Sequence, residues 1–406
     1  MSDNPAGVSV EEARRHVLRG LRKLGAEDVA LDAALGRVLA TDVVARGDLP
    51  AADNSSMDGY AVVAADLAHA TETSSVVLPV RGEARAGRPI THGGPGTAVL
   101  IATGALLPSG ADSIVPVEAT SSAPGGVAFS QPTEPGSFVR RRGEDVHTGD
   151  VLLAAGCRLR SVDVGACAAA GVDRVSVARR PRVALLSTGD ELVAPGVAPE
   201  AHQVTDINTA MLTAAVLEAG GVTVPLGVVT DDRDAVSAAL VRARDSADLI
   251  VSSAGVSMGE HDHVRQCVAE LGSVDIWKVA MRPGRPLVVG SVGDTPFLGL
   301  PGNPVSSAVT FLLFARAAIL ALQGATTLLP HRLTAVLGDD VDKPAHLETY
   351  VRVRLESSGD QLVARASGGQ GSAMMHALAT ADALAILPAG SAHLPASTAV
   401  EVMLIP

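Results

Sequence analysis

The sequence predicts a multidomain α/β protein whose central part is a doubly wound, mostly parallel sheet. Three observations predict this fold class. Short apolar strand patterns alternate with amphipathic helix patterns over residues 181–328, as in parallel sheets that are covered on both faces. The stretches 46–146 and 329–406 instead carry short strand-prone runs divided by Gly and Pro, which is typical of β-rich domains. The chain of 406 residues is also too long for one ordinary core.

The changes of pattern divide the chain into four domains. The mixed pattern of helices and strands in residues 1–45 returns after residue 146. The β-rich block between these segments is therefore predicted to be an insertion within one domain. The pattern of the C-terminal residues favours a small barrel. The expected domains are a mixed α/β connecting domain (1–45 and 147–180), an inserted β-rich domain (46–146), an αβα domain (181–328) and a C-terminal β-barrel-like domain (329–406).

Local signals place the helices. A capping box at residues 9–12 precedes apolar positions at helical spacing, which predicts one amphipathic helix over residues 10–24 with Gly25 as its stop. Residues 31–39 predict a second, short helix. In the central domain, Asn208 is predicted to cap a helix.

Composition narrows the possible partners. Lys and Arg total 32 against 44 Asp and Glu, a formal net charge of −12, so nucleic acid is not expected as the main partner. Cys157, Cys167 and Cys267 lack metal-ligand spacing and are expected to be buried thiols of a reducing compartment. No export signal is visible, and the apolar segment 305–322 contains Arg316, so we expect a buried helix, no membrane partner and a cytoplasmic location.

The loops after the predicted strands of the central domain form the candidate site. In a parallel sheet these loops emerge at one edge, where open α/β sheets bind ligands and helix N-termini favour anions. A single Asp there is more often a helix cap, but carboxylates beside cations in five such loops suit a phosphate ester held with Mg²⁺. The charged residues of these loops are Asp190, Glu191, Asp231, Asp232, Glu260, Asp262, Lys278, Arg282 and Arg285.

Four polar stretches outside these loops have two interpretations each. Residues 53–58 fit either turn chemistry or a site. Thr103, beside a glycine, either caps a turn or faces a ligand. The charge run 140–145 is either a solvated face or an anion site. Residues 367–372 form a polar loop that is either a plain connection or a cover over a site.

Six motifs, in one order along the chain, resemble the molybdopterin molybdenumtransferase family (MoeA), which also includes the gephyrin E domain. The resemblance covers nearly the whole chain from about residue 9. The motifs are Asp53-Asn-Ser-Ser-Met-Asp-Gly-Tyr60, Arg142-Gly-Glu-Asp145, Ser187-Thr-Gly-Asp-Glu-Leu192, Ser253-Ala-Gly-Val-Ser-Met-Gly-Glu260, Trp277-Lys278 and Leu300-Pro-Gly-Asn-Pro-Val305.

The resemblance implies Mg²⁺-dependent hydrolysis of adenylyl-molybdopterin, insertion of molybdate as the second substrate, and release of AMP. It implies an elongated homodimer whose active site lies between the third domain of one subunit and the second domain of its partner. By motif, the metal-binding residues would be Glu191, Asp231 and Asp262. The catalytic residues would be Asp262, Lys278, Arg282, Asp145 and Asp58. The substrate-binding residues would be Thr103, Glu191, Asp231, Ser253, Gly255, Pro301, Pro304, Arg352 and Ser372.

The chain departs from this family in two places. Where Lys-Pro-Gly-Lys-Pro is usual, it has Arg282-Pro-Gly-Arg-Pro286, and Ala254 replaces a frequent Gly. Arginine keeps the charge and binds oxyanions through two donors but does not deprotonate, so we expect anion binding without a proton-donor role.

The sequence leaves two alternatives to the transferase. One is a scaffold of the gephyrin type, but the acidic site residues are retained. The other is a molybdopterin adenylyltransferase, which would need none of the flanking domains.

Overall fold

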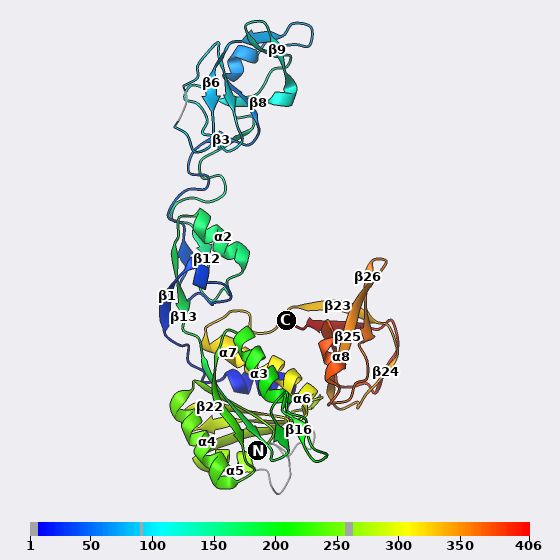
Figure 1. Ribbon diagram of the computed structural model, residues 1–406. Coiled ribbons are helices and arrows are strands. Elements are labelled where there is room, and N and C mark those ends of the chain that lie inside the picture. The colour runs from blue at the N-terminus through cyan, green and yellow to red at the C-terminus, as the bar shows by residue number, and fades with distance from the viewer. Residues whose placement is uncertain (1–6, 90–91, 256–262) are drawn as a thin grey trace.

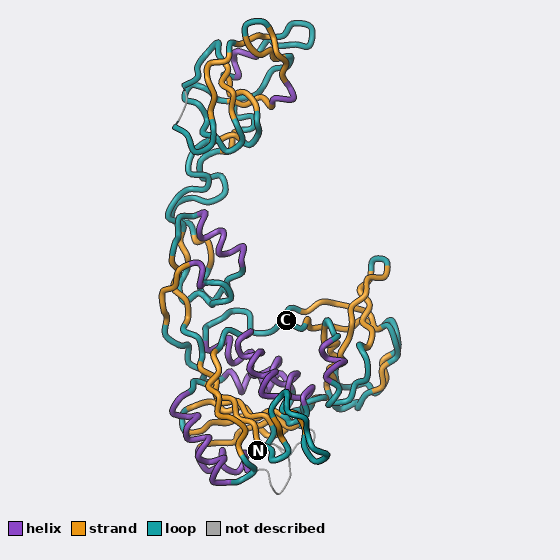
Figure 2. The backbone as a smooth tube through the Cα atoms, viewed as in Figure 1, coloured by secondary structure: helices purple, strands orange, loops and turns teal. Residues whose placement is uncertain are grey.

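The computed structural model describes residues 7–89, 92–255 and 263–406, except for the side chain of Trp277. The molecule is elongated, with a β-rich unit at one end and a connecting unit in the middle (Figure 1). The αβ unit and the C-terminal unit lie together at the other end (Figure 1). Figure 2 shows that the neck between the β-rich and connecting units consists of loop segments.

The αβ unit is built on a six-stranded sheet. β17, β14, β18 and β22 run parallel, and β21 is antiparallel to both of its neighbours. β19 therefore points the same way as the four parallel strands, which confirms the prediction of a mostly parallel sheet. In spatial order the strands are β17 (Val222–Val229), β14 (Arg182–Thr188), β18 (Leu249–Ser253), β22 (Thr295–Leu300), β21 (Pro286–Val292) and β19 (Gly272–Lys278).

Helices cover both faces of this sheet. Alternate residues of a strand point to opposite faces, and β14 shows this, since Val183 and Leu185 belong to one hydrophobic cluster while Ala184 and Leu186 belong to another. The first cluster contains α1 (Val10–Leu18), α3 (Ile207–Glu218), α6 (Pro304–Thr310), the π-helical turn η4 (Phe311–Ala315) and α7 (Arg316–Leu322). The second contains α4 (Arg233–Ser246) and α5 (His263–Leu271). The sheet is thus doubly wound.

The helix from Pro304 to Leu322 is long and apolar enough to cross a membrane, but 83% of it is buried inside the protein. Its side chains pack with those of α1, α3 and the sheet. Such burial is what a core helix shows, as the sequence predicted.

The C-terminal unit is a closed barrel of five strands. β25 pairs with both β26 and β27, which closes the ring. A short strand of the αβ unit, β20 (Met281–Arg282), joins this sheet by pairing with β25. The other elements are β23 (Arg332–Leu337), β24 (Val341–Asp342), β25 (Glu348–Ser358), β26 (Gln361–Ala366), α8 (Met375–Ala379), β27 (Ala383–Leu387), β28 (His393–Leu394) and β29 (Ala399–Leu404).

The connecting unit brings together the segments on either side of the inserted block. β1 (Ala26–Ala30) pairs with β13 (Arg174–Ala178), and β2 (Val43–Val44) pairs with β12 (Val151–Leu153). α2 (Ser161–Ala169) packs beside them (Figure 1). The domain boundaries remain predictions, and the packing refines them at one place, because α1 lies in the core of the αβ unit.

The β-rich unit contains two small sheets and one strand pair. The four-stranded sheet has the order β6 (Val80–Ala84), β7 (Ala98–Ile101), β4 (Gly59–Val62) and β8 (Ser113–Pro116). The three-stranded sheet has the order β5 (Val76–Leu78), β10 (Gly126–Phe129) and β9 (Thr120–Ala123), and β3 (Asn54–Ser55) pairs with β11 (Val139–Arg140). The 3-10 helices η2 (Ala64–Leu67) and η3 (Val117–Ala119) complete the unit.

Two predicted helices differ from the structure. The helix predicted over residues 10–24 ends at Leu18, because the chain turns at Gly20 with φ of +83°. The helix predicted over residues 31–39 is only the 3-10 turn η1 (Leu31–Ala33), and Gly36 follows with φ of +73°. In both cases apolar residues recur at helical spacing beyond the end of the helix. They do so because they pack on the core from segments that are not helical.

The cap of α3 also differs. Asp206, not Asn208, is the N-cap, and its side chain accepts a hydrogen bond from the Thr209 amide. All three cysteines are unpaired, and Cys167 and Cys267 are buried.

Candidate functional site

The loops after β14, β18 and β22 meet at one edge of the sheet and line a cavity of about 600 Å³. The first turn of α3 and Ala373 of the C-terminal unit also line this cavity. Five of the predicted site residues line it: Glu191, Ser253, Gly255, Pro301 and Pro304.

Carboxylates crowd one side of this edge. The Asp231 amide donates to Asp190 Oδ1 at 3.3 Å. Desolvation, and then the negative charges of Asp190 and Glu191, raise the pKa of Asp231 above its usual value. Excess negative charge on oxygen donors fits a Mg²⁺ ion, which needs only one or two protein carboxylates when phosphate and water supply its other ligands.

The third predicted metal ligand, Asp262, lies outside the described residues. In the part of the chain that is described, no three His, Cys, Asp or Glu side chains form a complete metal site. Of the three predicted metal ligands, Glu191 and Asp231 are the two that lie within the described residues.

Cations lie along the same edge. Lys278 ends β19 and is half-buried, and Arg282 is exposed on β20. Arg282 is also paired with Thr349 in the ladder between β20 and β25. The C-terminal unit thus holds the backbone of the loop that carries the arginine.

The loop 367–372 leads into Ala373, which lines the cavity. Arg352 is 1% exposed, and its Nη2 donates to the carbonyls of Gly369 and Gly371 at 2.8 and 3.2 Å. The Ser372 carbonyl accepts from the Val305 amide at the start of α6, at 3.1 Å. Burial lowers the pKa of the Arg352 guanidinium. The structure therefore connects Arg352 to the cavity through this loop.

Three predicted site residues lie away from the cavity. Asp58 Oδ1 accepts from the amide and hydroxyl of Thr103 at 2.7 and 2.9 Å, and these bonds lower the pKa of the exposed Asp58 carboxyl. Both residues belong to the β-rich unit at the far end of the molecule (Figure 1). Asp145 lies in the neck, where its amide donates to the Leu49 carbonyl. One subunit does not bring these side chains to the cavity.

Asn208 is a cavity residue that the sequence suggested only as a helix cap. Its Nδ2 donates to Ser253 Oγ and to the Gly302 carbonyl, both at 2.7 Å. The sequence placed Asn208 at the start of a helix on the edge where the strand loops meet, but that position does not indicate which groups its side chain contacts.

The turn after β18 needs a left-handed backbone at two successive residues. Gly255 has φ of +72°, and a Cβ there would lie 2.3 Å from Val264 Cγ2, so only glycine fits. Ala254 has φ of +71°, a conformation that costs a non-glycine residue about 1–2 kcal/mol.

We expect Ala254→Gly to raise the free energy of unfolding by about 0.5 kcal/mol, because relief of backbone strain is partly offset by the greater freedom of glycine in the unfolded chain. Urea unfolding measures the change. A variant less stable than the parent would show that the methyl group of Ala254, which lies beside Gly302, stabilises the turn more than the backbone strain destabilises it.

Comparisons with known proteins agree with this architecture. Family models match residues 8–171 (MoeA N-terminal region, domain I and II), 184–321 (probable molybdopterin binding domain) and 334–405 (MoeA C-terminal region, domain IV). Molybdopterin molybdenumtransferase 2 of Mycobacterium tuberculosis is 38% identical over 402 residues, which cover 97% of this chain and 98% of that protein. The chain belongs to the MoeA family.

Other MoeA proteins match over similar lengths. Molybdopterin molybdenumtransferase of Bacillus subtilis is 34% identical, covering 100% of this chain and 96% of the relative. The crystal structure of the molybdopterin biosynthesis MoeA protein from Pyrococcus horikoshii has a TM-score of 0.77 at 32% identity, covering 98% of this chain and 99% of that one. The MoeA fold assigned from the sequence motifs is confirmed.

Proposed function

We propose that this MoeA protein is a molybdopterin molybdenumtransferase that hydrolyses adenylyl-molybdopterin, inserts molybdate into molybdopterin and releases AMP in molybdenum cofactor biosynthesis. The main support for the proposal is the arrangement of charged residues at one edge of the sheet. A cavity at the sheet edge has the Glu191 and Asp231 carboxylates on loops of the same edge as the cations Lys278 and Arg282. This arrangement suits an anionic ester that is bound together with a cation.

In this proposal Glu191 and Asp231 hold Mg²⁺, and Asp262 joins them by motif. When bound, Mg²⁺ neutralises and orients phosphate oxygens. The crowding of Asp231 by two other carboxylates supports the assignment, because a cation removes the repulsion that raises its pKa.

Lys278 and Arg282 bind the phosphate and molybdate oxyanions. Their positive charges stabilise the charge that develops as the adenylyl ester is cleaved. Arg282 acts through its charge and its paired donors and not as a proton donor. Ser253, Gly255, Pro301 and Pro304 shape the cavity that orients the substrate. Arg352 and Ser372 contribute from the C-terminal unit.

The proposed enzyme is a homodimer in which Asp58, Thr103 and Asp145 reach the cavity of the partner subunit. Two features support this. These residues lie far from their own cavity, as described above. The connecting unit also exposes the apolar side chains of Leu35, Val44, Val151 and Val162 by 45–63%, which a dimer contact at this unit would cover. The three unpaired thiols agree with a cytoplasmic location.

The proposal is tested by incubating the purified protein with adenylyl-molybdopterin and molybdate, with and without Mg²⁺. We expect AMP release that depends on both Mg²⁺ and molybdate and that stops when EDTA is added. A scaffold of the gephyrin type would release no AMP, and an adenylyltransferase would consume ATP without needing molybdate. Either result would contradict the transferase.

A further inference from the structure

The first turn of α3 is bonded to three of the loops that form the cavity. Asn208 Nδ2 donates to Ser253 Oγ at the end of β18 and to the Gly302 carbonyl after β22. The adjacent Thr209 Oγ1 lies 2.7 Å from Ser187 Oγ at the end of β14. One helical turn therefore fixes the ends of three neighbouring parallel strands.

The chemistry of the partners fixes the orientation of the Asn208 amide. A backbone carbonyl such as that of Gly302 only accepts hydrogen bonds, so the atom facing it must be the NH₂ group. The same NH₂ group reaches Ser253 Oγ. The amide nitrogen thus donates one hydrogen bond to each of two loops. A hydroxyl group has only one proton to donate and a carboxylate has none, so neither group could make both bonds.

Asn208 also carries a feature that stability alone does not explain. Its Oδ1 is buried and has no hydrogen-bond partner among the described residues, and an unpaired buried acceptor lowers stability. An unfavourable feature of this kind at a binding cavity is typical of a functional residue.

We propose that Asn208 is a positioning residue, which holds Ser253 and the 301–304 loop at the separation that the substrate requires. The proposal rests on the proposed function, since it concerns the same cavity. α3 is a suitable support because Leu212 and Val216 anchor it in the core at 2% and 0% exposure, and Asp206 caps it. The two loops already pack closely, with the Ala254 amide donating to the Leu300 carbonyl at 3.1 Å.

The experiment compares Asn208→Ala and Asn208→Asp with the parent protein. Both variants lose the two donated bonds. Ala places no second acceptor against the Gly302 carbonyl and is favourable in a helix, so the first variant should fold even if the second does not. We expect the KM for adenylyl-molybdopterin and the Kd of the probe AMP to rise about tenfold in both variants, while kcat changes much less. Leu217→Ala is the control, because Leu217 is exposed on the same helix, and its KM should equal that of the parent.

A double-variant comparison separates positioning from a general structural role. If Asn208 acts through Ser253, then Ser253→Ala should raise KM by a smaller factor in the Asn208→Ala protein than in the parent. Equal factors, or a parent-like KM in both Asn208 variants, would overturn the proposal. A parent protein that releases no AMP would refute the transferase function itself, which is a distinct outcome.

Discussion

Asp231→Asn is expected to make the ligand-free protein more stable and, at the same time, to lower Mg²⁺-dependent AMP release about 100-fold at limiting Mg²⁺. The two effects have one cause. Asp231 lies close to Asp190 and Glu191, and desolvation together with their charges raises its pKa. Asparagine removes the repulsion and also removes a proposed ligand of the cation.

The sign of the pH dependence follows from the raised pKa. A carboxyl whose folded pKa lies above its unfolded value contributes stability below the unfolded pKa, and that contribution is lost as pH rises through the folded pKa. At pH 7 the ionised Asp231 therefore destabilises the fold. We expect the asparagine variant to be more stable by about 0.5 kcal/mol at pH 7, since solvent screens this exposed group, and to lose that advantage below about pH 4.

Urea unfolding at pH 7 and pH 4, together with AMP release over a range of Mg²⁺ concentrations, measures both effects. Asp234→Asn is the matched control, because Asp234 is an exposed carboxylate in the first turn of α4 and is not part of the proposed site. Its AMP release should equal that of the parent. A stabilised Asp231→Asn protein with parent-like AMP release would remove Asp231 from the cation site.

The strand ends of the αβ unit could be predicted because strand signals are local. The apolar run at 222–229 has the same bounds as β17, and the runs ending near Leu186 and Val251 led to the loops that now meet at the cavity. The rule that parallel strands end at one edge then placed Glu191, Ser253 and Pro301 together without knowledge of the strand order.

The less predictable features depend on contacts between distant residues. Nothing local to Asn208 indicates that Gly302, 94 residues away, would accept its hydrogen bond. Arg352 is another case, because a lone arginine in a strand pattern is expected at the surface, whereas here loop carbonyls satisfy its buried guanidinium. The end of α1 at Leu18 was missed because Leu21 and Leu24 keep helical spacing while packing on the core from a non-helical segment.

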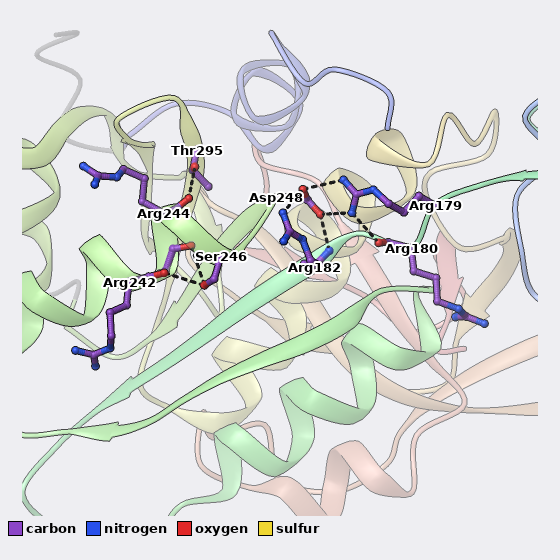
Figure 3. Close-up of polar contacts among 9 residues, drawn as sticks. Arg179, Arg180, Arg182, Arg242, Arg244, Ser246, Asp248 and Thr295 are labelled. Atoms are coloured by element: carbon purple, nitrogen blue, oxygen red, sulfur yellow. Dashed lines mark hydrogen bonds and ion pairs between the residues drawn. The ribbon is translucent and has the colours of Figure 1, made fainter. Parts of the chain in front are cut away.

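Asp248→Asn is expected to lower the free energy of unfolding of the αβ unit by about 2 kcal/mol at pH 7. Asp248 precedes β18 at the sheet edge opposite the cavity and is 12% exposed (Figure 3). Its carboxylate accepts from Arg179 Nη1 and Nη2 at 2.8 and 3.0 Å and from the Arg182 amide at 2.8 Å. Arg179 lies between β13 and β14, so this pair fixes the junction between the connecting and αβ units.

The effect depends on pH in the opposite sense to that of Asp231. Burial alone would raise the pKa of Asp248, but the hydrogen bonds from Arg179 and Arg182 outweigh it and lower the pKa to about 2. A lowered folded pKa gives stability that is present above the unfolded value, near 4, and is lost as pH falls through the folded value. The difference between parent and variant should therefore fall to about half its neutral value at pH 3.

The comparison with Asp245→Asn decides whether burial gives the Asp248 pair its strength. Asp245 also accepts from an arginine, Arg244, at 2.8 Å, but its side chain is 62% exposed, and exposed ion pairs contribute little because water screens them. Urea unfolding of the Asp245 variant should match the parent at both pH values. If the Asp248 variant also matched the parent, the junction between the two units would depend on its backbone pairing and apolar contacts, and the Arg179–Asp248 pair would have no part in holding the connecting unit against the αβ unit.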